Sequence, residues 1–287
     1  MLVDLVAVMT TDNVRLDGML VRPPAGSRPA LGFDAAILHH GVGGNFYNSN
    51  FFEHVTEQLV DRGVAVLRVN NRGHDLMYNS PTGRLGAAFE KLDDAQRDWT
   101  AWLDFATAQG FERVAVVGHS LGAVKTILYG AGTPDPRVVS LVAVSPPRFC
   151  YSEYARLDTS GRFKGYYDKA QAMVDAGDAD GLLAVDIPTN VVLAAKTYVD
   201  KYGPHERFDI LRHLPNVSLP ILVTIGSEEG KGPTASDWYP FGGLATKVAS
   251  LAEGQSNVSF RLIDGADHMY STRAPELWTA IDELAGR

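Results

Sequence analysis

Short apolar runs alternate with longer stretches of helical period along most of the chain. Runs that are apolar at nearly every position are typical of strands buried on both faces of a parallel sheet. They are Ala35–His39, Val64–Val69, Val114–Val117 and Val138–Val144. Between them apolar residues recur at helical spacing, as at Phe52, Val55 and Leu59. This alternation predicts an α/β fold with a mostly parallel central sheet covered by helices.

Two apolar runs at the start of the chain, Leu2–Met9 and Val14–Val21, predict a pair of strands. Residues with turn propensity, Thr11-Asp12-Asn13, connect them. The first run carries Asp4 and no basic residue, so we interpret it as a strand and not as a secretion signal.

The alternation of strands and helices breaks at Ser145-Pro146-Pro147 and resumes at the apolar run Ile221–Ile225. The intervening residues are richer in Tyr, Asp and Gly and show no clear strand. Short helices are expected there, for example over Tyr166–Val174 and Val191–Tyr198. The sequence therefore predicts a helical cap, residues 146–219, inserted into one core domain that comprises residues 1–145 and 220–287.

After the cap, the pattern again predicts strands and helices. We expect a helix over Phe241–Leu251, a strand over Val258–Ile263 and a last helix that begins near Pro275.

Composition narrows the class of protein. The chain has 287 residues, 45% of them hydrophobic, which is ordinary for a folded domain with a sizeable core. A net charge of -8 argues against nucleic acid as a partner, because phosphate binding requires a basic surface. The single cysteine, Cys150, forms no internal disulfide and no cysteine-based zinc site. No apolar run approaches the roughly 18 residues of a membrane span, so we expect a cytoplasmic protein without a membrane partner.

The strongest chemical signal is the segment Gly118-His119-Ser120-Leu121-Gly122. The pattern G-x-S-x-G alone carries little information, but here an apolar strand precedes it and a helix-forming stretch, Leu121–Tyr129, follows it. A sharp turn from strand to helix strains the serine backbone and exposes the hydroxyl at the sheet edge, while small glycines let strand and helix pass closely. Ser120 is therefore the candidate nucleophile.

A serine hydroxyl needs a general base, which in this arrangement is expected late in the chain, after the last strand. His268 lies there, in Asp264-Gly265-Ala266-Asp267-His268. The other histidines lie in an early strand end, in helices, loops or the cap, or inside the turn of Ser120; they are His39, His40, His54, His74, His119, His205 and His213.

An acidic residue should orient that histidine, and it is expected in the loop after the strand that follows the cap. Glu229, three residues after Gly226, is the favoured candidate. Glu228 and Asp237, in the same loop, remain alternatives.

A glycine-rich turn, His39-His40-Gly41-Val42-Gly43-Gly44, directly follows an early strand. Such a turn can present a backbone N–H to a developing oxyanion. We expect Val42 to provide one donor and Leu121, the residue after the nucleophile, to provide the other.

These motifs, in the order Ser, acid, His, resemble the α/β-hydrolase superfamily, in its serine esterase type with a helical cap. Two further segments agree: Asn71-Arg72-Gly73-His74 resembles the family's loop after the fourth strand, and Gly226-Ser227-Glu228-Glu229 resembles its GxxD motif with glutamate in place of aspartate. The resemblance implies hydrolysis of esters, thioesters, lactones or related acyl compounds. Ser120 excludes the subfamilies that use a nucleophilic aspartate.

Aromatic residues are frequent in the predicted cap and could form either a substrate pocket or the cap's own core. They are Phe149, Tyr151, Tyr154, Phe163, Tyr166, Tyr167, Tyr198, Tyr202 and Phe208. We favour the core for most of them, because a thin insert needs large side chains to bury enough area. Trp238 and Tyr239 are further candidates for the edge of a pocket.

The function that these signals favour is a serine hydrolase that cleaves a small or medium carboxylic ester through an acyl-enzyme intermediate. A thioesterase, a lactonase or a C–C bond hydrolase with the same triad, or a ligand-binding receptor on the same fold, are the alternatives. The expected partner is a small ester-like molecule, and a homodimer is left open. We expect no cofactor and no metal, because the chain has no Gly-rich phosphate loop and no H-E-x-x-H motif.

Overall fold

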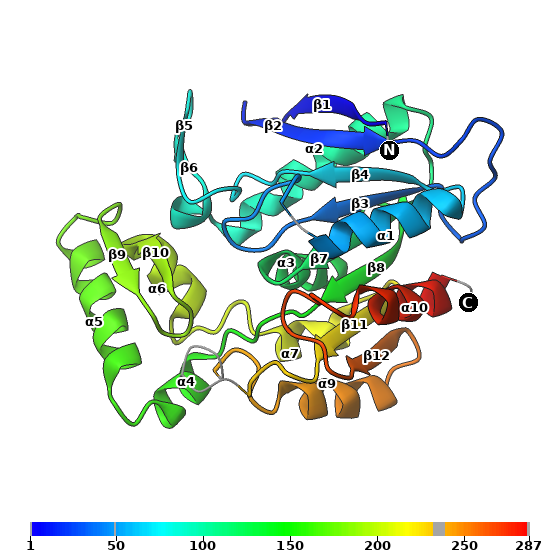
Figure 1. Ribbon diagram of the computed structural model, residues 1–287. Coiled ribbons are helices and arrows are strands. Elements are labelled where there is room, and N and C mark those ends of the chain that lie inside the picture. Colours follow the sequence, from blue (N-terminus) through cyan, green and yellow to red (C-terminus); the bar gives the residue numbers. More distant parts are fainter. Residues whose placement is uncertain (1, 49, 232–238, 286–287) are drawn as a thin grey trace.

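A central sheet of eight strands runs through the computed structural model, which describes every residue except 1, 49, 232–238 and 286–287 (Figure 1). In spatial order the strands are β1 (Asp4–Met9), β2 (Arg15–Val21), β4 (Ala65–Val69), β3 (Ala35–His39), β7 (Val114–His119), β8 (Val138–Val144), β11 (Ile221–Gly226) and β12 (Val258–Ile263). Strand β2 is antiparallel to both of its neighbours, whereas all pairs from β4 to β12 are parallel. The predicted mostly parallel sheet is confirmed.

Helices cover both faces of the sheet and make a three-layer arrangement (Figure 1). One face is covered by α1 (Asn50–Asp61) and α10 (Ala274–Ala285), and the other by α2 (Ala95–Ala108), α3 (Leu121–Ala131) and α9 (Leu244–Glu253). Successive side chains of a strand point to opposite faces, so Leu38 of β3 packs in the first layer and Ile37 in the second. This double burial explains why the central strands are apolar at nearly every position.

The parallel strands end at one edge of the sheet, and this edge faces the segment inserted after β8 (Figure 1). The loops that follow β3, β7, β11 and β12 therefore begin side by side, although they lie far apart in the sequence. Ligand sites of open parallel sheets form at this edge.

The insert between β8 and β11 contains both helices and strands. Its elements are α4 (Tyr151–Leu157), α5 (Arg162–Asp175), β9 (Leu182–Val185), β10 (Val191–Ala194), α6 (Ala195–Tyr202), α7 (Ile210–His213) and the short 3₁₀ helix Leu214–Asn216. In Figure 1 the segment from α5 to α6 stands beyond the edge of the sheet, whereas α7 lies back under the core, where it contacts α3.

The expected helix over Val191–Tyr198 is wrong in its first half. Residues 191–194 form β10, which pairs with β9 in an antiparallel hairpin, and helix α6 begins only at Ala195. The run Val191-Val192-Leu193-Ala194 is rich in β-branched residues, which favour a strand once a partner strand is available. The expected helix over Tyr166–Val174 is confirmed within α5.

Smaller differences between the expected and the observed elements appear in the core domain. Helix α9 begins at Leu244, later than the expected Phe241. A short hairpin, β5 (Tyr78–Ser80) with β6 (Gly83–Leu85), and two 3₁₀ turns, Ala87–Phe89 and Leu92–Asp94, precede α2 without a clear sequence signal. None of the described helices combines the length and the apolar character needed to cross a bilayer.

Glycine at position 122 lets the first turn of α3 pack against the end of β3. A Cβ atom there would lie 2.6 Å from the carbonyl oxygen of His40 and 2.8 Å from that of His39. Both atoms belong to the backbone, so a side chain at this position requires the strand end to move. Gly165, inside α5, is a contrast, because a Cβ atom at that position would have no heavy atom within 4 Å.

We expect opposite effects when the two helical glycines are replaced by alanine. Gly122→Ala should lower the free energy of unfolding by about 2 kcal/mol, because overpacking against backbone outweighs the better helix propensity. Gly165→Ala should raise it by about 0.5–1 kcal/mol, because alanine restricts the unfolded chain and meets nothing in the fold. Urea unfolding of both variants checks this, and a stabilised Gly122→Ala protein would contradict the packing argument.

Candidate active site

Ser120 occupies the sharp turn between β7 and α3. Its backbone has φ 56° and ψ -122°, a conformation that non-glycine residues rarely adopt. The turn is held because the Ser120 N–H donates to the carbonyl oxygen of Val144 at 2.9 Å. Gly118 on the strand side has no room for a side chain, since a Cβ would lie 2.4 Å from the carbonyl oxygen of Gly122. The strained turn is thus a consequence of tight packing between strand and helix.

His268 lies between Ser120 and Glu229. Its Nε2 is 3.0 Å from Ser120 Oγ, and its Nδ1 is 2.5 Å from Glu229 Oε1. The backbone of His268 is held as well, because His119 Nε2 donates to its carbonyl oxygen at 2.8 Å. Burial lowers the pKa of His119 to about 3, so this ring is neutral and acts as a fixed donor. The structure therefore brings together the three residues that the sequence analysis favoured.

Glu229 is locked by a second set of contacts. Its Oε2 accepts hydrogen bonds from Ser145 Oγ at 2.6 Å and from the Gly226 N–H at 2.7 Å, which leaves Oε1 for His268. The side chain of Glu229 is only 2% exposed, whereas that of Glu228 is 51% exposed and pairs with Lys231. The geometry favours Glu229 over its neighbour. The third candidate, Asp237, lies outside the described residues.

Ser145 is a site residue that sequence analysis missed. It follows β8 with φ 51°, and its hydroxyl is within 3.0 Å of the Tyr270 hydroxyl as well as bonded to Glu229. The Tyr270 hydroxyl also lies 2.9 Å from Thr224 Oγ1. The one available signal was position: Ser145 directly follows a parallel strand, at the edge where sites form.

The turn after β3 lies directly against Ser120. A Cβ at Gly41 would be 2.7 Å from Ser120 Cβ, so only glycine allows this approach. His40 fixes the turn: its Nδ1 donates to the Gly41 carbonyl at 2.8 Å, and its Nε2 accepts from the Asn71 N–H at 3.1 Å. Burial lowers the pKa of His40 to about 4, which agrees with a neutral ring in this double role.

The two expected oxyanion donors, Val42 and Leu121, border the same space. Val42 follows Gly41 in the turn, and Leu121 is the first residue of α3. Within the described part of the chain neither backbone N–H donates a hydrogen bond. Both amides are therefore available to a ligand at Ser120.

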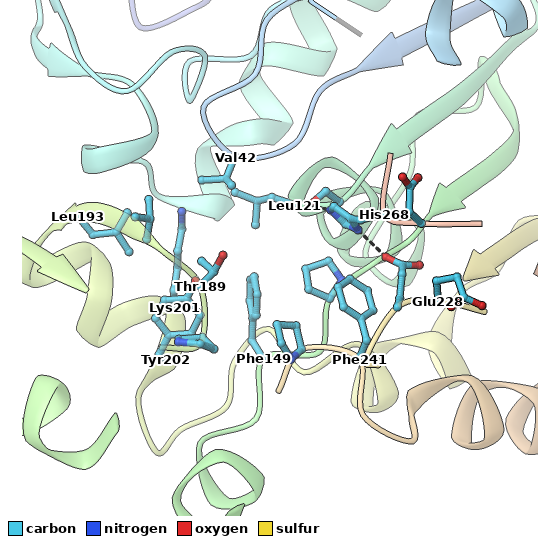
Figure 2. Close-up of a pocket in the computed structure, with 18 residues that line it drawn as sticks. Val42, Leu121, Phe149, Thr189, Leu193, Lys201, Tyr202, Glu228, Phe241 and His268 are labelled. Carbon is cyan, nitrogen blue, oxygen red and sulfur yellow. Dashed lines mark hydrogen bonds and ion pairs between the residues drawn. The ribbon is translucent and has the colours of Figure 1, made fainter. Parts of the chain in front are cut away.

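A cavity of about 350 Å³ opens next to Ser120 and His268. The insert and the core both contribute to its wall, which is largely apolar (Figure 2). The apolar lining includes Pro147, Phe149, Pro188, Val191, Leu193, Tyr202, Pro240 and Phe241. The polar lining includes Thr189, Lys201, Glu228 and Asp267.

The aromatic residues of the insert divide between core and cavity. Phe149 and Tyr202 line the cavity, whereas Tyr154, Phe163 and Tyr198 are buried in the core that the insert shares with the sheet. Tyr239 is also buried and Trp238 lies outside the described residues. Most of these side chains thus serve packing, as expected.

Three buried charged residues connect the insert with the core. Glu90 Oε1 accepts a hydrogen bond from Lys125 of α3, and Glu90 Oε2 lies 3.4 Å from Lys201 Nζ of α6. Glycine at position 73 leaves room for this carboxylate, because a Cβ there would lie 2.0 Å from Glu90 Oε1. Burial alone would raise the pKa of Glu90, but the two ammonium groups outweigh it and hold the pKa at about 2.

One group of potential metal ligands occurs among the residues that the structure describes: Cys150, Glu206 and Asp209. Its carboxylates already have partners. Glu206 accepts from the Ser152 N–H at 2.8 Å, and Asp209 pairs with Arg148 at 2.9 Å. These contacts account for the group as a set of bonds inside the insert.

Comparison with known proteins assigns the family. Residues 36–280 match the sequence profile of the alpha/beta hydrolase family. The chain belongs to this family, and it is a hydrolase. No curated protein sequence matches it.

Solved structures share the fold along nearly the whole chain. An esterase of Pyrococcus furiosus is 18% identical with a TM-score of 0.63, over 99% of this chain and 90% of its own. Est1E from Butyrivibrio proteoclasticus, solved with ferulic acid bound, is 17% identical with a TM-score of 0.65, over 96% of each chain. The alpha/beta hydrolase GrgF from a Penicillium species is 14% identical with a TM-score of 0.67, over 99% of this chain and 98% of its own.

Replacement of Glu90 tests the buried charge cluster. Glu90→Gln should lower the free energy of unfolding by about 3 kcal/mol at neutral pH, because two buried ammonium groups lose their counter-charge. The folded pKa of about 2 lies below the ordinary 4.5. The stabilising contribution is therefore complete above about pH 4.5 and disappears as the pH falls toward 2.

Urea titrations of the wild type and of Glu90→Gln at a series of pH values between 7 and 3 check this expectation. The difference in stability should be constant down to about pH 5 and should shrink below it. A difference that does not change with pH would show that Glu90 carries no charge in the folded protein.

Proposed function

We propose that this hydrolase cleaves carboxylic esters through an acyl-enzyme intermediate on Ser120. The observation that carries the proposal is the continuous contact from Ser120 Oγ through both ring nitrogens of His268 to a buried, locked Glu229. A nucleophile, a base and an orienting acid in this geometry are the groups that acyl transfer requires.

Glu229 sets the tautomer of His268. The Nδ1–H group of His268 donates a hydrogen bond to Glu229 Oε1 and keeps its proton. The lone pair of Nε2 therefore faces Ser120 Oγ, at 3.0 Å. When Oγ attacks the carbonyl carbon of the ester, Nε2 takes its proton, and the carboxylate stabilises the imidazolium that forms. Ser145 and the Gly226 N–H keep that carboxylate in place during the step.

The negative charge that develops on the carbonyl oxygen is bound by the N–H groups of Val42 and Leu121. Support for these donors comes from the close approach of Gly41 to Ser120 and from the position of Leu121 at the start of a helix, where the amides point outward. The imidazolium of His268 then protonates the leaving alcohol. Water, deprotonated by the same Nε2, attacks the acyl-enzyme and releases the acid.

The size of the cavity favours a small or medium substrate. A volume of about 350 Å³ is near the lower end of small-molecule sites, and the wall is mostly apolar. Two of the structural neighbours are an esterase and a protein solved with ferulic acid, and their fold covers 99% and 96% of this chain. A thioester, a lactone or a diketone C–C bond would use the same residues, so a panel of esters and thioesters of matched acyl groups separates these alternatives.

Labelling by a fluorophosphonate probe tests the nucleophile and separates an enzyme from a binding protein. The wild type should be labelled at one site, and Ser120→Ala should lose both the label and turnover of p-nitrophenyl butyrate. The matched control Ser160→Ala changes an exposed serine of the insert and should keep both. A label that survives Ser120→Ala would overturn the assignment, and an intact wild type without any turnover would favour a receptor.

Replacing each candidate carboxylate by its amide tests which residue orients His268. Glu229→Gln should lower kcat about a hundredfold or more. A neutral amide accepts a weaker hydrogen bond from the Nδ1–H group of His268, and it lacks the negative charge that stabilises the imidazolium. Glu228→Gln, whose side chain faces solvent, should cost less than about tenfold. Asp237→Asn is the third arm. Steady-state kinetics of the three variants decide: a near-normal Glu229→Gln enzyme beside a crippled second variant would move the role to that residue.

A further inference from the structure

A buried lysine forms part of the cavity wall. Lys201 belongs to α6 of the insert, its side chain is 2% exposed, and it lines the same cavity as Ser120. Figure 2 shows Lys201 beside Leu193, Thr189 and Tyr202 at one end of the cavity, whereas His268 and Glu228 lie at the other end. A buried cationic group in a largely apolar wall needs a reason, because its burial is costly.

The charges around Lys201 do not balance. Two ammonium groups, those of Lys125 and Lys201, share the single carboxylate of Glu90. The nearby His40 is neutral, since burial lowers its pKa to about 4. With both ammonium groups protonated, the cluster carries one net positive charge. Lys125 holds the closer position on Glu90, and the contact of Lys201 is the longer one, at 3.4 Å.

Further donors at this end of the cavity lack acceptors. Lys201 has three N–H donors and, within the described part of the chain, a hydrogen bond to Glu90 alone. The hydroxyl groups of Tyr202 and Thr189 make no hydrogen bond to any described residue. Burial lowers the pKa of Lys201, so an anion beside it would also stabilise its protonated form. These groups together are suited to a ligand oxygen with negative charge.

Two carboxylates line the opposite end of the cavity, and one of them, that of Glu228, is paired with Lys231. Glu228 and Asp267 line this end, on the side of His268, and the whole chain carries a net charge of -8. The overall field thus disfavours anions, and a preference for an anionic substrate has to come from Lys201. The leaving oxygen must lie next to His268 Nε2 to be protonated, so the acyl part takes the end where Lys201 lies.

We propose that the substrate is a monoester of a dicarboxylic acid, whose free carboxylate binds Lys201 while Ser120 attacks the ester carbonyl. The proposal rests on the serine hydrolase activity proposed above. Lys201 is then a specificity-determining residue: it binds one end of the acyl group and takes no part in bond making or breaking.

The experiment compares esters that differ only in the distal group. Monomethyl succinate, glutarate and adipate are matched by methyl butanoate, pentanoate and hexanoate, in which a methyl group replaces the carboxylate. For the best chain length, the wild type should show a kcat/KM at least about tenfold higher for the hemiester, as expected for a charged hydrogen bond in a buried site. Equal or lower values for the hemiester at every length would overturn the proposal.

Two lysine variants of helix α6 test whether the preference for the hemiester depends on Lys201. Lys201→Met removes the ammonium group but keeps most of the apolar side chain, and it leaves Glu90 paired with Lys125, so the cluster becomes neutral and folding should persist. Its kcat/KM for the hemiester should fall at least about tenfold, mainly through KM, while the neutral ester changes less than about threefold. Lys196→Met is the control, because Lys196 pairs with Asp180 at the surface and does not line the cavity. A Lys201→Met enzyme that retains the preference would refute the role.

Binding measurements separate this proposal from the proposed function. Calorimetry of Ser120→Ala with glutarate and pentanoate needs no turnover. Tighter binding of glutarate, abolished in Ser120→Ala/Lys201→Met, supports the carboxylate site even if neither ester is hydrolysed by the wild type. Equal binding of the two acids, with hydrolysis of the neutral esters intact, overturns the carboxylate site and leaves the serine hydrolase in place.

Discussion

The close approach of three backbone segments around Ser120 is the constraint on which the rest of the site depends. The end of β3, the turn after β7 and the start of α3 pass so near to each other that Gly41, Gly118 and Gly122 have no room for a side chain. This packing forces the strained backbone of Ser120 and turns its hydroxyl toward the cavity. It also places the free backbone N–H groups of Val42, after β3, and of Leu121, at the start of α3, at the same cavity as the hydroxyl. The parallel sheet supplies the geometry, because all these segments leave it at one edge.

Polar contacts at this edge of the sheet hold Glu229 and His268 in line with Ser120. Glu229 is held by Ser145 and by its own loop, and His268 is held by Glu229 and by His119. Apart from the bond within the Glu229 loop, each of these bonds joins segments far apart in the chain, so the alignment depends on the folded core and not on any one loop. Neutral, buried His119 shows that a histidine next to the site can serve as scaffold.

The insert contributes a wall of the cavity that the core sheet and its covering helices do not form by themselves. It covers the sheet edge with an apolar wall, and through Lys201 it extends a charged contact to Glu90 of the core. Gly73 belongs to a motif that resembles a family loop, and the structure gives it a physical role: its missing side chain leaves the space that the Glu90 carboxylate fills. A loop motif, a buried ion cluster and the cavity wall are thus parts of one arrangement.

Local sequence patterns determined most of the core strands and helices and the turn at Ser120. Apolar periodicity specified the buried strands and the covering helices, and the spacing of Gly118, Ser120 and Gly122 after a strand specified the turn, because these features depend on neighbours in the sequence. Tertiary structure decided what local patterns leave open. Residues 191–194 became a strand because β9 lies beside them, and Glu229, not the adjacent Glu228, met His268 because Ser145 from another strand end holds its carboxylate. The charge of Lys201 in the cavity depends on Glu90 and Lys125, which are separated from it by many residues. Such outcomes arise from contacts between distant segments, which no local pattern encodes.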